Sequence, residues 1–177
     1  MSNFIDLCKR RQSCREFSSR PVEHEKLAQC IEAARLAPSA CNSQPWSFVA
    51  VEDPQLVLEV AKCAQRLGIN EYVSKAGAFI VVLEEHAVLM PQLRAMLDSQ
   101  YFAKGDLGGA VVTICYAAED LGLGSLIIGL YDREKLCSLL NIPIEKRFAG
   151  LIALGYPASD NVRPKQRKQM EEIARFV

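Results

Sequence analysis

The polar residues that could carry chemistry in this 177-residue chain gather in three short clusters. Two clusters are basic: residues 10–15 (RRQSCR) near the start of the chain and residues 163–168 (RPKQRK) near its end. Taken singly, each could be a solvated surface, because arginine and lysine side chains are mostly exposed. Taken together, they could supply bidentate guanidinium and ammonium contacts to a doubly charged phosphate group.

The third cluster, residues 38–46 (PSACNSQPW), sets serine, asparagine and glutamine side chains between two prolines. Such a loop is stiff, and its amides suit a heterocycle with carbonyl and N–H groups along one edge. The alternative is a turn after a helix, in which Asn42 and the serines satisfy local backbone groups and Trp46 fills the core. The spacing alone leaves both interpretations open.

Several catalytic motifs are missing, which removes whole classes of enzyme. The glycines at 122, 124 and 129 lack the dinucleotide-binding spacing and follow a predicted helix instead of opening one. The chain has no P-loop and no serine in a hydrolase-type setting. With only His24 and His86, the sequence supports neither a hydrolytic triad nor a metal site.

The composition indicates a soluble globular protein. Hydrophobic residues make up 50% of the chain, and 21 basic residues balance 21 acidic ones, so no nucleic-acid or membrane partner is expected. The seven cysteines are odd in number and form no Cys-x-x-Cys pair, which favours reduced thiols. The longest apolar runs, residues 107–118 and 121–131, are too short to cross a bilayer, and no secretory signal is apparent. We therefore expect a cytoplasmic protein.

Hydrophobic periodicity predicts helices and scattered strands. Helices are expected at residues 2–11, 22–36, 54–67, 106–120 and 133–140, with a basic helical tail from Pro164 onward. Strands are expected at residues 47–51, 79–83, 125–128 and 150–154. Asp106 is the candidate N-cap of the fourth helix, which is apolar on every side and so should lie centrally in the core. Because strands and helices do not alternate strictly, the order favours an α+β fold.

In order and spacing these segments resemble the nitroreductase family. The resemblance rests on Arg11-x-Ser13-x-Arg15-x-Phe17, the stretch Ala37–Phe48, the Asp106-led helix closing with LGLGS at 121–125, ALGYP at 153–157, and the basic tail. It covers almost the whole chain, and the stretch PSxxNSQPW is its most specific part. It implies one nitroreductase-like α+β domain over residues 1–177, with a central, mostly antiparallel sheet flanked by helices, and a homodimer.

The resemblance also implies an FMN site at the subunit interface, contacted by both chains. One group of residues would hold the phosphate and the ribityl chain: Arg11, Ser13, Lys165 and Arg167. Arg15 would reach the pyrimidine edge of the flavin. A second group would line the isoalloxazine ring: Ser39, Ala40, Asn42 and Gln44. Residues 126–129, with Ile128 and Gly129, would lie against the other face of the ring, and Asn70 is a weaker candidate.

The implied activity is that of an FMN-dependent oxidoreductase. NADH or NADPH reduces the flavin and leaves, and a nitroaromatic, quinone or similar acceptor takes the electrons at the same place. No catalytic side chain is expected, because the flavin carries the chemistry. Arg15 would stabilise the anionic reduced flavin by a charge-assisted hydrogen bond. Longer family members have a segment that roofs the active site, and residues 86–104 leave little room for one here.

Three alternatives remain. Some relatives in this superfold remove halogen from aromatic rings or fragment the flavin, chemistries that need lid residues not identified in this sequence. A second alternative is a non-catalytic dimeric protein that stores or senses flavin. A third is an interaction module with the three clusters on its surface. Cys41, next to the expected flavin, is either a redox thiol or a small residue filling a tight loop.

Overall fold

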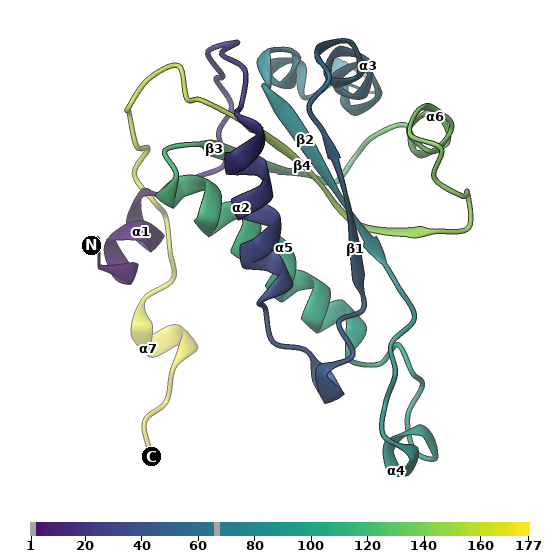
Figure 1. Ribbon diagram of the computed structural model, residues 1–177. Helices are drawn as coiled ribbons and strands as arrows, with labels where there is room; N and C mark the ends of the chain where they lie inside the picture. Colours follow the sequence, from purple (N-terminus) through teal and green to yellow (C-terminus); the bar gives the residue numbers. More distant parts are fainter. Residues whose placement is uncertain (1–2, 66–67) are drawn as a thin grey trace.

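A four-stranded antiparallel sheet with strand order β1-β2-β4-β3 forms the centre of the protein (Figure 1). The computed structural model describes residues 3–65 and 68–177. The strands are β1 (Trp46–Val51), β2 (Ala78–Glu84), β3 (Gly124–Ile128) and β4 (Arg147–Gly155). All four predicted strands are present, and the predicted α+β fold with an antiparallel sheet is confirmed.

The helices described are α1 (Phe4–Arg10), α2 (His24–Arg35), α3 (Pro54–Ala64), α4 (Pro91–Arg94), α5 (Ala103–Asp120), α6 (Arg133–Leu139) and α7 (Met170–Ile173). Two short 3-10 turns, η1 (Ala40–Asn42) and η3 (Glu71–Lys75), lie in the connections. The predicted helices before residue 150 are confirmed within a few residues. The predicted ends at Ser2 and Leu67 lie outside the described residues.

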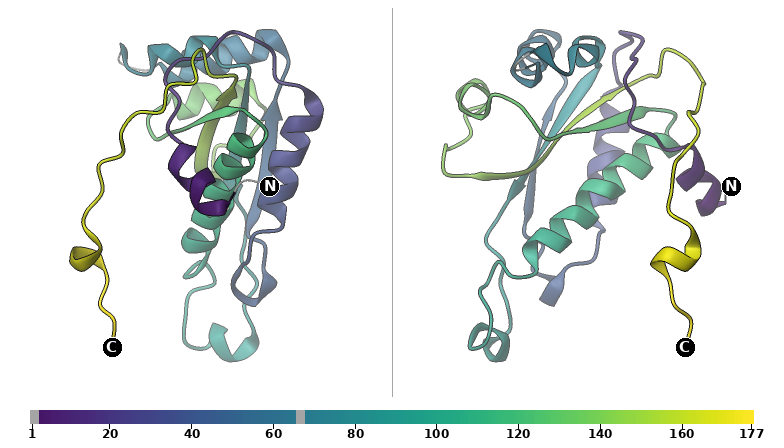
Figure 2. Two further views of the ribbon diagram at one scale, coloured as in Figure 1. Left: turned by 90° about the vertical axis from the view of Figure 1, so that its left-hand side faces the viewer. Right: turned by 180° about the vertical axis from the view of Figure 1, so that it is seen from behind.

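Helices cover both faces of the sheet, so the central strand β2 is buried on both sides (Figures 1 and 2). Phe79 and Val81 pack into the core beneath α3 and α6. Ile80 and Val82 point the other way, into the core formed with α2 and α5. A strand buried on both faces has to be apolar at every position, which accounts for the continuous run FIVVL.

The long helix α5 differs from its prediction at both its start and its surface. It begins at Ala103 with Phe102 as its N-cap, so the prediction that Asp106 caps the helix is wrong; Asp106 lies in the first turn. The predicted central position is confirmed by its packing against α2, β2, β3 and β4, but Gly105, Gly108 and Val112 lie on a side that this chain leaves exposed. An apolar sequence predicts that a helix packs against other elements, but it does not predict which of its sides they cover.

The C-terminal end of α5 follows the sequence closely. Gly122 adopts a left-handed φ of +75° just after the helix, a conformation that costs glycine little. The Gly122 N–H donates to Glu119 O at 3.1 Å, and the Leu123 N–H donates to Ala118 O at 2.7 Å. This pair of bonds is a Schellman motif, which ends the helix and turns the chain directly into β3.

The segment after β4 is extended, so the prediction of a helical tail is wrong. Apart from the single turn of α7, residues 157–177 have no regular structure and run away from the sheet (Figure 1). The basic run at 163–168 has no apolar side to bury, and helical propensity alone rarely sustains a short helix in water. Its extended backbone is instead available to hydrogen bond with residues 11–13.

A polar network joins the start of α2 to the segment after β4. The Tyr156 hydroxyl donates to Glu23 Oε2 at 2.7 Å and accepts from Lys26 Nζ at 2.8 Å. Lys26 also donates to Leu121 O at 2.8 Å, and Arg20 donates to Glu23 Oε1 at 2.8 Å. The Tyr156 hydrogen bond, aided by Arg20, lowers the pKa of Glu23 from 4.5 to about 2.

This network predicts a specific acid sensitivity. Because the folded-state pKa of Glu23 is depressed, its stabilisation is present above pH 4.5 and is lost as the pH falls toward 2. The variant Tyr156→Phe should therefore lose less unfolding free energy than the wild type between pH 4.5 and 2, as measured by urea unfolding at a series of pH values. Parallel losses in the two proteins would contradict this assignment.

Among the described residues, no helix combines the length and apolarity needed to span a bilayer.

Candidate functional site

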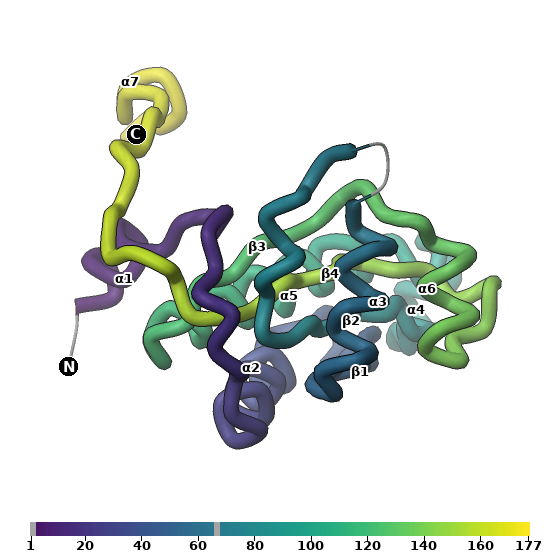
Figure 3. The backbone as a smooth tube through the Cα atoms, turned by 90° about the horizontal axis from the view of Figure 1, so that it is seen from above, coloured from purple at the N-terminus to yellow at the C-terminus, as the bar shows by residue number. Residues whose placement is uncertain are grey.

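The two basic clusters of the sequence meet in one groove. Residues 11–15 form one wall of the groove. The other wall belongs to residues 161–167, which we call the strap, and the two segments run side by side (Figure 3). The groove has a volume of about 350 Å³. Its lining includes the four residues predicted to hold the phosphate and the ribityl chain, which are Arg11, Ser13, Lys165 and Arg167. It also includes Arg15, which was predicted for the ring edge, and one further cation, Arg163. The predicted pairing of the two clusters is thus present in the structure.

Hydrogen bonds to backbone oxygens hold the strap in place. The Gln12 side chain donates to Asn161 O at 2.8 Å, and Lys165 Nζ donates to Arg11 O. Arg163 donates through Nη2 to Ser13 O at 2.6 Å and through Nε to Gln12 Oε1 at 3.1 Å. The guanidinium of Arg163 therefore acts as a clamp between the two walls. Sequence reasoning missed this residue, because a basic run does not show which of its cations bind within the chain.

The groove concentrates positive charge that its own residues do not neutralise. Partial burial of Lys165, together with the charges of Arg11 and Arg167, lowers the pKa of the Lys165 ammonium. The Nε of Arg11 is buried and has no hydrogen-bond partner among the described residues. Buried donors normally have partners, so this cluster has the electrostatic character of an anion site.

The amide loop, defined as residues 39–44, is the second part of the predicted site, and its backbone is unusual. Cys41, Asn42 and Gln44 have positive φ angles of 54°, 52° and 47°. Each non-glycine residue in this region costs about 1–2 kcal/mol, although asparagine tolerates it better. Such strain persists only where the surroundings impose it, and it is typical of functional sites.

The hydrogen bonds of the amide loop are mostly internal. The Asn42 N–H donates to Ser39 O at 3.0 Å, the Ser43 N–H donates to Ala40 O at 3.0 Å, and the Gln44 N–H donates to Ser39 Oγ at 3.0 Å. The Ala40 N–H donates to Asp106 Oδ2 on α5 at 3.1 Å. Asn42 and Gln44 are exposed, and although the Gln44 amide nitrogen donates to Asn42 O at 3.3 Å, the other amide atoms of both residues are available to a ligand. Ser43 Oγ is buried without a partner among the described residues.

The end of β3, which was predicted to lie against the flavin ring, exposes the side chain of Ile127 and buries that of Ile128. Ile128 is only 3% exposed and packs in the core beneath α3 and α6, so it offers backbone atoms alone to the outside. Its neighbour Ile127 is 47% exposed, and Gly129 is exposed as well. Strict alternation along a strand requires this difference, but the sequence did not show which side of β3 faces the core.

Asn70, the weaker candidate, uses its side chain within the chain. Its amide donates to Ala64 O at 3.0 Å and to Leu130 O at 3.5 Å, and its carbonyl oxygen accepts from the Tyr72 hydroxyl at 2.7 Å. These bonds hold the turn that follows Gly129.

Residues 11–15, which line the basic groove, and the amide loop lie near opposite ends of α5 (Figure 1). Near the first end Asp106 binds Ala40, and near the second end Glu119 pairs with Arg10 at 3.4 Å. A rise of 1.5 Å per residue places these two helical positions about 20 Å apart. One chain therefore does not bring the two groups of predicted site residues together.

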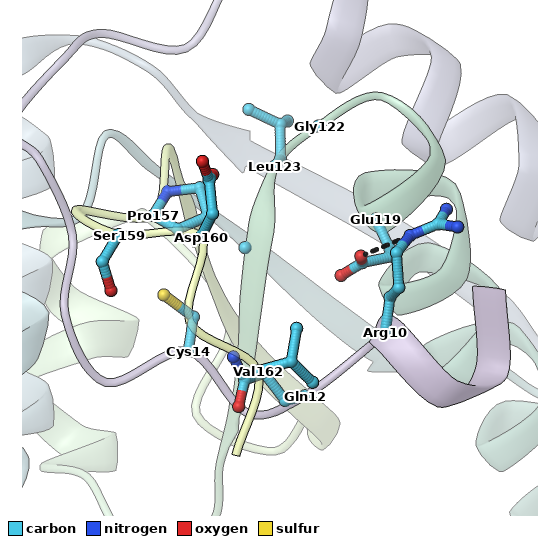
Figure 4. A pocket seen from close by; sticks show the side chains of 11 residues that line it. Arg10, Gln12, Cys14, Glu119, Gly122, Leu123, Pro157, Ser159, Asp160 and Val162 are labelled. Carbon is cyan, nitrogen blue, oxygen red and sulfur yellow. Dashed lines mark ion pairs between the residues drawn. The ribbon is translucent and has the colours of Figure 1, made fainter. Parts of the chain in front are cut away.

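A second cavity, of about 290 Å³, adjoins the groove and shares Gln12 with it (Figure 4). It was not predicted, and its walls include Arg10, Cys14, Glu119 and Asp160. Burial raises the pKa of the Cys14 thiol, which donates to Glu16 O at 3.3 Å, so this sulfur is not an activated nucleophile. In the part of the chain that the structure describes, no three histidine, cysteine or acidic side chains gather as metal ligands would.

Comparison with known proteins identifies the family. The profile of the Nitroreductase family matches residues 8–156. The chain belongs to the nitroreductase family, and the recognition made from its motifs is confirmed.

Individual relatives agree with this assignment. A protein of Archaeoglobus fulgidus, provisionally named NADH dehydrogenase/NAD(P)H nitroreductase, is 31% identical over 164 residues, which cover 90% of this chain and 88% of the relative. An iodotyrosine deiodinase of Thermotoga neapolitana is 28% identical over 186 residues, covering 99% of this chain and 98% of the relative. A solved structure from Exiguobacterium sibiricum, provisionally described as a nitroreductase in complex with FMN, has the same fold. Its TM-score is 0.84 at 20% identity, covering 100% of this chain and 98% of that one.

The unneutralised groove predicts that simple anions stabilise the protein. Inorganic phosphate at ten times its Kd should add about 1.4 kcal/mol to the free energy of unfolding, a rise of about 4 °C in Tm. The variants Arg11→Ala and Lys165→Ala should lose most of this rise. Lys168→Ala is the matched control, because Lys168 is exposed in the same basic run but does not line the groove. An equal rise in all four proteins would mean that phosphate acts elsewhere.

Proposed function

We propose that the protein is an FMN-dependent oxidoreductase that uses NADH or NADPH to reduce a small organic acceptor. Family membership supports this proposal, as do relatives named for NAD(P)H-dependent reduction. The observation that carries it is the basic groove, where Arg11 has an unpartnered buried Nε and Lys165 a lowered pKa. A phosphate monoester would neutralise these cations, and the exposed amides of Asn42 and Gln44 suit the polar edge of a flavin ring.

Each group of site residues has a distinct task in this proposal. Arg11, Ser13, Lys165 and Arg167 hold the phosphate and the ribityl chain, while Arg163 keeps the strap against residues 12–13. Arg15 offers a positive charge to the ring edge that becomes negative on reduction. When bound, FMN supplies the redox chemistry, accepting a hydride and passing on two electrons. The chain then needs no catalytic acid or nucleophile, and its part is to orient the reactants and stabilise charge.

We propose further that the working unit is a homodimer, in which the basic groove of one chain meets the amide loop of the other. The separation of about 20 Å along α5 supports this arrangement, because it keeps the two groups apart within one chain. The exposed apolar side of α5, with Gly105, Gly108 and Val112, offers a surface for a second copy. The extended segment beyond residue 157 carries exposed Met170, Ile173 and Phe176, as an arm that packs on a partner would.

The domain, the location and the acceptor are parts of the same proposal. We treat residues 1–177 as one nitroreductase-like domain that acts in the cytoplasm, where its seven unpaired cysteines would stay reduced. Nitroaromatics and quinones are the proposed acceptors. The connection between β2 and α5, residues 85–102, contains only the short helix α4 and projects from the sheet (Figure 1). We propose that it leaves the acceptor side open to ligands of different shapes. The iodotyrosine deiodinase relative makes halogenated phenols worth including among the acceptors tested.

The first test is an anaerobic absorption titration of the purified protein. We expect oxidised flavin bands that NADH or NADPH bleaches and that a nitroaromatic or quinone restores. Bands that neither nucleotide bleaches would favour a non-catalytic flavin-binding protein. A colourless chain that does not bind added FMN would contradict both interpretations and leave an interaction module.

A complementation experiment tests whether the site is shared. One tagged chain carries Arg11→Ala and Lys165→Ala, and a second, differently tagged chain carries Asn42→Gly and Gln44→Gly, which removes the amides but tolerates positive φ. Neither homodimer should retain FMN. If each site uses the groove of one chain and the loop of the other, the heterodimer has one intact site and should bind one FMN. A heterodimer without FMN would show that both groups act within one chain.

A further inference from the structure

One carboxyl group, that of Asp106, joins the amide loop to helix α5. Among the described residues, the Asp106 Oδ2 contact with the Ala40 N–H, at 3.1 Å, is the side-chain hydrogen bond that reaches residues 39–44 from outside the loop. The other bonds within these residues join loop atoms to each other. The loop thus holds three left-handed non-glycine residues with one side-chain anchor from outside, while the Trp46 N–H donates to Gln44 O at 2.8 Å where the loop enters β1.

The Asp106 carboxyl group can act as this anchor because the described residues show no other interaction that requires it. Phe102 is the N-cap of α5, so the Asp106 side chain is not used to cap its own helix. None of the ion pairs found within the described residues involves Asp106. Its place in the first turn suits an acidic side chain, because the helix N-terminus carries partial positive charge.

Ala40 is the point at which such an anchor has most effect. It is the first residue of η1, directly before the left-handed Cys41 and Asn42. Its carbonyl oxygen accepts from the Ser43 N–H at 3.0 Å, so a fixed Ala40 peptide also fixes the turn that follows. Asn42 and Gln44 take their direction from this turn, since their backbone angles place the two exposed amides.

We propose that Asp106 is the positioning residue of the amide loop: its carboxyl oxygen holds the Ala40 peptide and thereby orients the amides of Asn42 and Gln44 toward the flavin ring. The role of the amides rests on the proposed function, whereas the anchoring of the loop does not. Asp106 lies behind the loop and acts through Ala40 rather than by touching the ligand. Without this bond, the left-handed residues lose the contact that offsets their strain, and the loop samples other conformations.

Two variants at Asp106 separate the hydrogen bond from the carboxyl charge. Asp106→Ala removes the acceptor, whereas Asp106→Asn keeps a carbonyl oxygen of nearly the same shape. We expect Asp106→Ala to bind FMN at least tenfold more weakly, with an increased KM for the acceptor, while Asp106→Asn stays within threefold of the wild type. Asp120→Ala is the matched control, because Asp120 is an exposed acidic residue at the other end of α5. Wild-type affinity in Asp106→Ala, or equal defects in the alanine and asparagine variants, would overturn the proposal.

A third variant removes the donor and leaves the carboxyl group in place. Ala40→Pro deletes the Ala40 N–H, and the Ser39 angles of φ −144° and ψ 152° are those accepted before proline. It should reproduce the Asp106→Ala defect, and the double variant should be no worse than either single one. Additive defects would show that the two groups act separately. This variant also tests the proposal if Asp106→Ala fails to fold.

Hydrogen exchange on the FMN-free protein keeps this proposal distinct from the proposed function. Amides in the peptide covering residues 38–46 should exchange at least tenfold faster in Asp106→Ala than in the wild type, and at wild-type rates in Asp106→Asn. The phosphate-induced rise in Tm, which reports the basic groove, should be unchanged in both. Unchanged hydrogen exchange of the loop amides in Asp106→Ala would reject the anchoring role of Asp106, whether or not the variant binds FMN normally. Faster loop exchange in a protein that binds no FMN would support the anchor and reject the flavin site.

Discussion

The length of α5 determines where ligand-binding groups can lie in this fold. The helix packs against α2 on one side and against β2, β3 and β4 beneath it, so its two ends are held at a fixed separation. Asp106 fixes the amide loop near the first end, and the turn at Gly122 leads into the strand next to the basic groove. A two-fold axis across the exposed side of such a helix brings the first end of one copy near the second end of the other. The symmetry would then create two equivalent sites at once.

Both parts of the proposed site are locally destabilising, and the free energy gained by packing the core offsets this destabilisation. The groove partly buries Lys165 beside Arg11 and Arg167, which lowers the pKa of its ammonium group, and the amide loop holds residues in the left-handed region. Neither arrangement would persist in a loosely packed protein. The sheet beneath them is buried on both faces along β2 and most of β4. The clustered cations and the left-handed residues are therefore both found where a ligand would be bound, as expected of functional sites.

The sequence predicted best the features that depend on residue type alone. The apolar run at 79–83 indicated a buried strand, and the structure buries it on both faces. Gly122 could end α5 because its position calls for a positive φ. Residues 126–129 were expected to lie against the flavin ring, and the structure turns the Ile128 side chain into the core. Alternation along a strand gives the spacing of the inward-facing residues but not which of the two sets faces inward. Asp106 preceded an apolar run and so resembled an N-cap, although the helix had already begun at Ala103. Arg163 was indistinguishable from its basic neighbours until its bonds to Ser13 and Gln12 were seen.

The strap has a consequence for the order in which the protein assembles. Its bonds join residues 149 to 154 positions apart, from Gln12 to Asn161 and from Arg11 to Lys165. The last strand of the sheet ends at Gly155, so the ribosome has delivered every strand before it makes the strap. Closing so long a loop is entropically costly and slow, and it becomes favourable only once the sheet has brought both walls near each other. The anion groove is thus a late product of folding, and capture of a phosphate-bearing ligand would follow the formation of the sheet and the strap.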